Sequence, residues 1–413
     1  MRRVAITGFG VVSPIGSDKR TFWDSLRNGR SGIDRITRFD CSTFAVQLAG
    51  EVKDDPPLPQ EVAEVYSYEP KVGFAFAAFT EAMNDAGIKC LGSDSLIHLG
   101  TSIQNFDMGN LVNDGKIDLK NTLHLSTRGG RYSIQIPLDL ATRLICDAYG
   151  QPGQSLTNCS ACAASLQAIG HGFNCLRTGR YDLAVCGGFD SLITPVLVGG
   201  FQLLGALTTE NKYGACASRP FDAARSGAVL GEGAAVVVME PLERALAEGK
   251  SILAEVCGYG STLDAYGLSA PDPEGDGAVR AMTSALDDAG IGPERIEHIN
   301  THGTGTRLND QIEALAIRKV FDGYWQKIPV SSTKSMTGHL IGATGSLEVG
   351  ACLMTLIEGV MPPNPSLEKV GQGCELNHIV GDAKEFNGEY VLSNSFGFGG
   401  QNATLVLRRY NGE

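Results

Sequence analysis

Residues 156–177 read LTNCSACAASLQAIGHGFNCLR, and residues 330–356 read VSSTKSMTGHLIGATGSLEVGACLMTL. Both stretches pass from a strand-like segment through a turn of small residues into an apolar helix. A glycine-rich strand follows each of them, AVCGGFDS at 184–191 and LSNSFGFGGQN at 392–402. The same order of elements occurs twice, which predicts that the chain contains a duplicated unit.

The rest of the chain fits a duplicated α/β fold. A chain of 413 residues is too long for one ordinary hydrophobic core, so we expect one half at 1–250 and another at 251–413. Strand-like runs alternate with helical periodicity, which is typical of layered α/β architectures. The predicted strands are 4–8, 97–101, 183–186, 234–240, 296–300 and 390–393, and the predicted helices are 72–86, 161–178, 277–289, 310–321 and 346–358.

The composition argues against several classes of protein. Hydrophobic residues make up 43% and charged residues 19%, as in a soluble folded protein. A net charge of −12 argues against binding to nucleic acid. No stretch approaches the ~18 uninterrupted apolar residues of a membrane span, and MRRVAITGFGVVSPIG at the start has no signal-peptide pattern. We therefore expect a cytoplasmic protein without membrane or nucleic-acid partners.

The cysteines point to the same compartment. There are eleven, an odd number, and several lie in apolar segments, as Cys186 and Cys352 do. Buried free thiols in a reducing compartment explain them better than disulfides. Cys159 and Cys162 have CxxC spacing. A redox or zinc site is the weaker interpretation, because no second CxxC or suitably spaced histidine pair completes it.

Cys162 is the candidate nucleophile. It lies near the start of the predicted helix 161–178, among small residues. Free N–H groups and the dipole at a helix N-terminus favour a thiolate, so we expect a lowered thiol pKa, and the same N–H groups can donate to an oxyanion. The alternative is that Cys162 is only a small buried hydrophobic residue.

His302 lies in INTHGTGT, where a predicted strand runs into a loop of glycine and threonine. Ligands of α/β proteins commonly bind at the carboxyl ends of strands. The hydroxyls of Thr304 and Thr306 can hydrogen-bond an extended substrate arm that carries amides. The alternative is an ordinary loop histidine between turn glycines.

His339 follows Lys334 by five residues, and Glu348 lies on the next helix among apolar neighbours. An unpaired carboxylate there would be costly, so we expect a buried Lys334–Glu348 ion pair. The alternative is a surface lysine and an exposed glutamate.

Phe398 lies in NSFGFGGQN, where flanking glycines let the backbone approach a reacting group and let the ring move. The alternative there is a simple turn before a strand.

Seven stretches, found in this order, carry a family resemblance: VAITGFGVVSPIG, SACAASLQAIG, SRPFD, HGTGT, STKSMTGH, GSLE and NSFGFGG. Across nearly the whole chain they resemble the β-ketoacyl-acyl carrier protein synthases, most closely type II. The resemblance implies the thiolase fold, in which two duplicated halves form a layered αβαβα structure, usually in a dimer. It also implies decarboxylative Claisen condensation of a Cys-bound acyl group with a malonyl carrier thioester.

The resemblance also implies roles for individual residues. Cys162, His302 and His339 correspond to a catalytic Cys-His-His triad, with Lys334 tuning the histidines and Glu348 holding the lysine.

Residues around this triad are implied to bind substrate. Thr304 and Thr306 would bind the phosphopantetheine arm, which the partner acyl carrier protein carries. Phe398 would gate acyl access, and its N–H with that of Cys162 would form the oxyanion hole. No cofactor is required beyond a structural Na⁺ or K⁺, implied near Asn300, Glu348, Ser393 and Asn394.

Several positions depart from the family pattern. The sequence after RPFD contains Arg225-Ser226-Gly227-Ala228, so a methyl group replaces an aromatic ring, and residues 264–267 read DAYG instead of DAYH. Positions that are often basic, where the acidic carrier protein docks, are occupied by Tyr66, Ser67 and Gly205, for which Arg128 and Arg131 are candidate substitutes. We expect a widened pocket and an altered docking face.

Four functions remain open at this point. The first is a homodimeric synthase that elongates fatty acids. The second is the ketosynthase subunit of a type II polyketide or polyene pathway, in a heterodimer with a chain-length factor. The third is a non-catalytic chain-length partner, which the presence of Cys162 and both histidines disfavours. The fourth is a thiolase acting on coenzyme A esters, which the paired histidines also disfavour.

Overall fold

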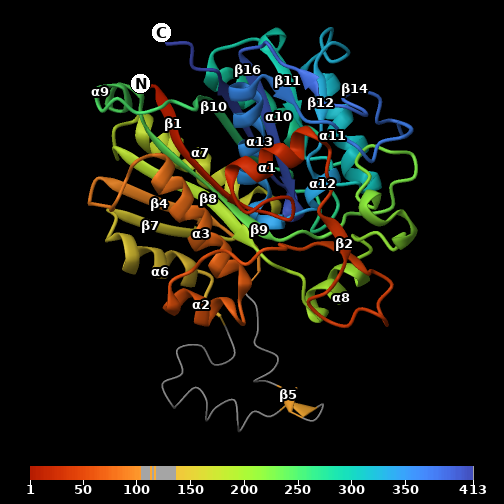
Figure 1. The fold of residues 1–413 in the computed structure, drawn as a ribbon. Helices are drawn as coiled ribbons and strands as arrows, with labels where there is room; N and C mark the ends of the chain where they lie inside the picture. The colour runs from red at the N-terminus through yellow and green to blue at the C-terminus, as the bar shows by residue number, and fades with distance from the viewer. Residues whose placement is uncertain (104–111, 114–115, 118–135, 413) are drawn as a thin grey trace.

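The computed structural model describes residues 1–103, 112–113, 116–117 and 136–412 (Figure 1). The first half contains β1 (Val4–Val12), α1 (Lys19–Arg27), β2 (Ile33–Arg35), β3 (Leu48–Gly50), α2 (Gln60–Tyr66), α3 (Pro70–Asp85), β4 (Ser95–Gly100), β5 (Val112–Asn113), β6 (Lys116–Ile117), α6 (Leu140–Tyr149), β7 (Gln154–Asn158), η1 (Ala161–Ala163), α7 (Ala164–Arg177), β8 (Leu183–Asp190), α8 (Pro195–Leu203), η2 (Asn211–Cys216), β9 (Gly233–Pro241) and α9 (Leu242–Ala247).

The second half repeats much of this order. It contains β10 (Ala254–Leu263), α10 (Asp276–Ala289), η3 (Pro293–Arg295), β11 (Ile296–Asn300), α11 (Arg307–Val320), β12 (Pro329–Ser331), α12 (Lys334–Thr337), η4 (Ile341–Ala343), α13 (Thr344–Glu358), β13 (Val360–Met361), β14 (Asn377–His378), β15 (Lys384–Glu385), β16 (Tyr390–Gly397), η5 (Phe398–Gly400) and β17 (Gln401–Arg408). The η elements are short 3₁₀ turns.

The sheet topology is duplicated. The strands of the first half lie in the order β7-β4-β8-β9-β1, and five strands of the second half lie in the matching order β12-β11-β16-β17-β10, with the short strand β14 added outside β12. In each half the first three strands of these series are parallel and the last two are antiparallel to their neighbours. The two sets join through β1 and β10, where Val4 lies opposite Val256.

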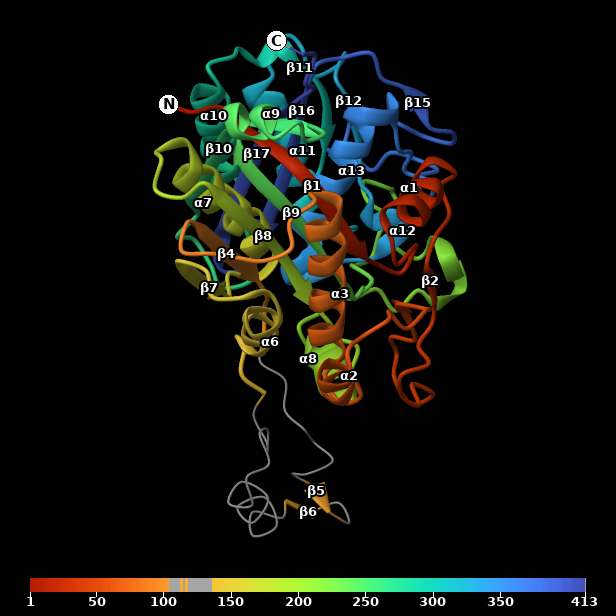
Figure 2. The same cartoon turned by 60° about the vertical axis from the view of Figure 1, so that its left-hand side comes forward.

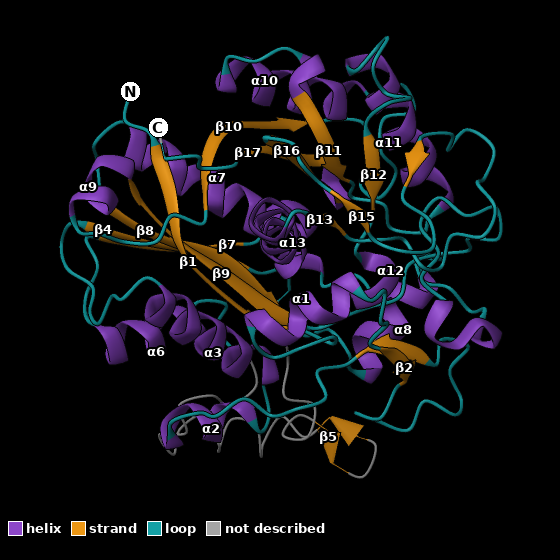
Figure 3. Ribbon diagram, turned by 45° about the horizontal axis from the view of Figure 1, so that its top comes forward, coloured by secondary structure: helices purple, strands orange, loops and turns teal. Residues whose placement is uncertain are grey.

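The elements form five layers, which confirms the predicted αβαβα thiolase fold. Helices α7 and α13 lie between the two sets of strands (Figure 3). Helix α3 covers the outer face of β1 and β9, next to α6 (Figure 2), and α10 and α11 cover the outer face of the second set. A separate apolar core fills each space between layers. The layers bring the start of α7 and the start of α13 close together at the centre.

The predicted strands and helices are present, with one informative difference. The predicted helix 161–178 is the turn η1 followed by the helix α7, because Ala161 has φ +50°, which an α-helix cannot accommodate.

The segment Ile341–Glu358 is long and apolar enough to cross a membrane, but 89% of it is buried inside the fold. The core helix of a soluble protein has the same properties.

Candidate active site

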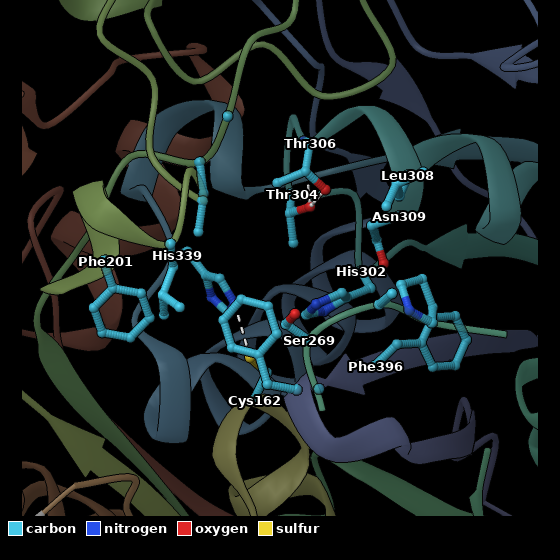
Figure 4. A pocket seen from close by; sticks show the side chains of 18 of the residues that line it. Cys162, Phe201, Ser269, His302, Thr304, Thr306, Leu308, Asn309, His339 and Phe396 are labelled. Atoms are coloured by element: carbon cyan, nitrogen blue, oxygen red, sulfur yellow. Dashed lines mark hydrogen bonds between the residues drawn. The ribbon is translucent and has the colours of Figure 1, made fainter. Parts of the chain in front are cut away.

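The site lies where the two halves meet. Cys162 is in the turn η1 and is 3% exposed, and it faces His302 after β11 and His339 before α13 (Figure 4). His339 Nε2 is 3.1 Å from Cys162 Sγ. The rings of His302 and His339 are 5.3 Å apart at 80°, and one ligand atom from each of the three residues lies within 4.8 Å of the others. The three predicted residues are thus brought together from both halves of the chain.

The protonation of Cys162 differs from the prediction. Burial raises the pKa of its thiol to about 11, although the N–H groups of Phe398 and Cys162 and the charge of Lys334 act in the opposite direction. The expected lowering of the pKa is wrong for the resting protein, because desolvation outweighs the donors. The thiol also lies in a 3₁₀ turn before the helix instead of in its first turn. The resting nucleophile is a neutral thiol.

Both histidines are held neutral. Burial lowers the pKa of His302 and His339 well below the ordinary value, and the nearby Lys334 ammonium lowers them further. The N–H of Ile341 lies 3.3 Å from His339 Nδ1, and Thr344 Oγ1 lies 2.9 Å from the same atom. Because a backbone N–H can only donate, Nδ1 is the acceptor and the ring proton is on Nε2. His339 Nε2–H therefore points at the reaction centre as a donor.

Lys334 and Glu348 form the predicted buried ion pair. Lys334 Nζ is 2.6 Å from Glu348 Oε1, and both side chains are at most 1% exposed. Thr333 Oγ1 donates to the same carboxylate oxygen at 3.2 Å. Burial raises the pKa of Glu348, and the Lys334 ammonium opposes that rise. The pair places a positive charge near the two imidazoles, which adds to the effect of burial in keeping both uncharged.

Two acidic residues of α11 shape the His302 loop, and sequence reasoning missed them. The N–H groups of His302 and Gly303 donate to the two oxygens of Glu313, each at 2.7 Å. The N–H of Thr304 donates to Asp310 at 3.1 Å. Asp310 and Glu313 are buried and three residues apart on one helix. The sequence could have indicated them, because two acidic residues on the apolar face of a helix need buried hydrogen-bond partners.

A cavity of about 490 Å³ opens onto the three residues. Thr304 and Thr306 line it, with their hydroxyls 2.9 Å apart (Figure 4). Phe398 lines it as well, is 37% exposed, and stacks on Phe201 with ring centroids 6.4 Å apart. Gly399 and Gly400 follow with φ +78° and +74°, a region that favours glycine. Phe398 is thus a partly exposed ring in the cavity lining, followed directly by two glycines.

Comparison with known proteins agrees with this geometry. The profile of the beta-ketoacyl synthase N-terminal domain matches residues 1–245, and that of the C-terminal domain matches residues 253–368. The chain belongs to the beta-ketoacyl synthase family. The 3-oxoacyl-[acyl-carrier-protein] synthase 2 of Coxiella burnetii is 40% identical over 99% of both chains.

Solved ketosynthases have the same fold. The ishigamide ketosynthase/chain length factor has a TM-score of 0.86 at 33% identity, covering 99% of this chain and all of the other. A type II polyketide synthase ketosynthase, solved in complex with its acyl-carrier protein and bound to the hexaketide, has a TM-score of 0.86 at 28% identity with the same coverage.

The residues expected to hold a cation fit that role in part. Asn300 Oδ1 and Glu348 Oε2 are buried oxygens without a hydrogen-bond partner among the described residues, and Ser393 is also buried. Oxygen ligands of this kind suit Na⁺ or K⁺. Asn394 differs, because its amide donates to Glu313 and accepts from Thr404 Oγ1 at 2.8 Å. Its side-chain oxygen therefore has one lone pair already engaged and one left for a cation.

Some of the departures from the synthase family pattern line the cavity, and others lie elsewhere. Ala228 lines the cavity and packs in the same apolar cluster as Cys162. Gly205 lines the mouth, next to Leu203 and Leu204, which are 89% and 66% exposed. Tyr66 donates to Asp55 from a partly buried position, and Ser67 is exposed. Arg128 and Arg131 lie outside the described residues.

Proposed function

We propose that this beta-ketoacyl synthase condenses an acyl group on Cys162 with malonyl-[acyl carrier protein] to give 3-oxoacyl-[acyl carrier protein], in fatty-acid or polyketide elongation. One observation carries the proposal: a buried thiol and two neutral imidazoles lie within 4.8 Å of one another at the end of a cavity. A thiol can hold an acyl group as a thioester, and neutral imidazoles can donate to an enolate oxygen.

The first step is acyl transfer. Cys162 Sγ attacks the thioester carbonyl of the acyl carrier protein, and the bond from that carbonyl to the phosphopantetheine sulfur breaks. The thiol proton of Cys162 goes, on balance, to the departing carrier thiol. The N–H groups of Cys162 and Phe398, which favour the thiolate, can donate to the tetrahedral oxyanion. Thr304 and Thr306 line the path of the phosphopantetheine arm and would bind its amides.

The second step forms the carbon–carbon bond. The malonyl thioester loses carbon dioxide, and the electron pair of the broken bond forms an enolate. His302 and His339 donate hydrogen bonds to the enolate oxygen, and a preorganised donor of this kind contributes about 3 kcal/mol. The enolate carbon attacks the acyl carbonyl, Cys162 Sγ leaves, and one proton is taken up to restore the thiol. Burial together with the charge of Lys334, which Glu348 holds, keeps the imidazoles neutral throughout.

A structural Na⁺ or K⁺ is part of the proposal. Asn300, Glu348, Ser393 and Asn394 would supply oxygen ligands, and the cation would compensate the second oxygen of Glu348, which has no hydrogen-bond partner within the described part of the chain. The cation takes no part in bond making or breaking.

The partners are an acyl carrier protein and a second subunit. Among the described residues, β7 is one of the two terminal strands of the large sheet and pairs only with β4, so its outer edge offers a ladder for a second chain. A heterodimer with a chain-length factor is the second candidate, because Ala228 widens the cavity and Gly205 removes charge from its mouth.

We also propose a cytoplasmic location, in keeping with eleven free cysteines.

Purified protein tests both candidates. The chain is supplied with an acyl and a malonyl carrier thioester, and products are identified by mass spectrometry while the oligomer is sized by light scattering. Condensation by a homodimer supports the fatty-acid synthase role. Condensation only after a chain-length factor is added supports the polyketide role. No condensation with any carrier thioester in either format contradicts the proposed function.

A further inference from the structure

The turn that carries the nucleophile has a counterpart in the other half. The turn η1 precedes α7 with Ala161 at φ +50°, and the turn η4 precedes α13 with Ile341 at φ +46°. Cys162 and Gly342 therefore occupy equivalent positions. The turn η4 faces the end of the strand β8, and the turn η1 faces the end of the strand β16. Both strands are eight residues long, and they have the same place in their respective halves. Asp190 ends β8 where Gly397 ends β16.

Gly397 and Asp190 occupy equivalent positions at the ends of their strands, but only Asp190 has a side chain that reaches the facing turn. A Cβ at Gly397 would lie 3.1 Å from Cys162 N, so glycine leaves space beside the N–H groups proposed as the oxyanion hole. In the other half Asp190 has a side chain, and its Oδ2 accepts from the N–H of Gly342 at 2.9 Å. Burial raises the pKa of Asp190, and the N–H of Gly342 and the Lys71 ammonium oppose that rise. Asp190 thus fills the counterpart of the oxyanion hole.

The filled turn holds His339. Ile341 is β-branched and lies in the left-handed region, a strained conformation that persists only where the surroundings enforce it. Its N–H donates to His339 Nδ1, and Thr344, the first residue after the turn, contacts the same atom. Gly342 packs closely, since a Cβ there would lie 2.6 Å from the backbone of Thr101. The bond to Asp190 is a side-chain contact that fixes this turn.

We propose that Asp190 is a positioning residue for the condensation step. By accepting from the N–H of Gly342, which matches the N–H of Cys162, it fixes the strained turn and so keeps the Nε2–H of His339 aimed at the enolate. Lys71 assists, because its Nζ lies 3.9 Å from Asp190 Oδ1, and both side chains are at most 3% exposed. Lys71 is itself anchored to the carbonyl of Ile103 at 2.7 Å. The inference rests on the proposed function.

Asp190→Ala tests the inference with two separate readouts. The acyl-enzyme is measured by intact mass, and the kcat of condensation is measured on fully acylated protein. We expect a 10- to 100-fold lower kcat, a KM for the malonyl thioester within about twofold, and a retained acyl-enzyme. Sodium formate should raise the kcat at least fivefold by replacing the carboxylate. A kcat within twofold of the unmodified protein, or no response to formate, overturns the inference.

A matched control separates positioning from stability. Glu240 is also a fully buried carboxylate, paired with Lys250 at 2.6 Å and remote from the cavity. Glu240→Ala should lower the melting temperature but keep the kcat of the folded fraction, and formate should not change that kcat. Equal losses of kcat in the two variants, or equal responses to formate, overturn the inference.

Asp190→Asn decides the matter if the alanine variant does not fold. Its amide oxygen still accepts from Gly342, so we expect a kcat within threefold of the unmodified protein. A loss above tenfold in folded Asp190→Asn overturns the inference. The unmodified protein is assayed alongside. If it does not condense, the proposed function fails, whereas normal turnover with an unaffected Asp190→Ala counts against the positioning role alone.

Discussion

The two halves differ most in the connection between strand and turn. In the first half β7 ends at Asn158 and the turn begins at Ala161, with only Cys159 and Ser160 between them. In the second half β12 ends at Ser331 and the turn begins at Ile341, so the connection spans 332–340. The helix α12 lies in this longer connection, and His339 follows it.

This difference divides the chemistry between the halves. The short connection presents a thiol on a bare turn, whereas the long one supplies the lysine and one histidine and ends in a turn with glycine at the thiol position. Each half alone has the architecture but lacks a complete site. Duplication supplied two similar frames, and function depends on where the frames differ. The predictions below test that division of labour, beginning with the largest expected effect.

Replacing the thiol should remove the contribution of the first half. Cys162→Ala is expected to abolish the acyl-enzyme and to lower condensation by roughly 10⁴-fold or more. Some malonyl decarboxylation should persist, because both histidines remain. Intact mass after incubation with an acyl carrier thioester measures the first effect, and release of carbon dioxide measures the second. An acyl adduct on another cysteine would refute the assignment.

Replacing either histidine should remove the contribution of the second half. His302→Ala and His339→Ala are each expected to lower condensation by about 10²- to 10³-fold, because an enolate donor is lost. The acyl-enzyme should still form, since Cys162 and its N–H groups are unchanged. Stopped assays of product together with intact mass separate the two steps. Unchanged product formation in either variant contradicts the role of that histidine in binding the enolate.

The residues of the site could be predicted from the sequence, but the pKa of the Cys162 thiol could not. Cys162, His302 and His339 could be found because each follows a strand in a distinctive turn or loop, and the Lys334–Glu348 pair because a lone carboxylate on an apolar helix needs a partner. The thiol pKa was predicted with the wrong sign, because the sequence shows the helix that follows Cys162 but not how deeply the thiol is buried.

Long-range pairing was also beyond the sequence. Glu313 binds the N–H of His302 from a helix that begins after the loop, and Asp190 binds Gly342 across 152 residues. Periodicity predicts that such carboxylates lie on a buried face, but not which backbone groups meet them. The duplicated fold could be predicted because the same elements recur along the chain, while contacts between the halves depend on packing.

Removing the charge in the long connection should shift the pH dependence. The Lys334 ammonium contributes to the lowered pKa of both histidines. In Lys334→Met that contribution is gone, so the imidazole pKa values rise and both rings become protonated at a higher pH. The acid limb of the kcat profile should move to higher pH, with roughly tenfold lower kcat at neutral pH.

The same change should destabilise the fold, because Glu348 is left buried without its partner. Breaking a buried pair costs about 3–5 kcal/mol, which thermal denaturation can detect. Glu240→Ala, which breaks a buried pair far from the cavity, is the stability control and should leave the acid limb in place. An acid limb unmoved in Lys334→Met means that the lysine does not control the histidines.

The smallest expected effect concerns the cavity on the side of the first half. Ala228 packs in the apolar cluster that contains Cys162, so Ala228→Phe should shorten the space available to the acyl chain. We expect kcat/KM for long acyl carrier thioesters to fall about tenfold, the scale set by a few lost methylene contacts, with short acyl chains within twofold. Ala228→Val should give a graded, smaller loss. An equal loss for every chain length would indicate damage to the nucleophile's surroundings instead of a shorter cavity, and would remove the structural basis for treating this synthase as one with a widened acyl pocket.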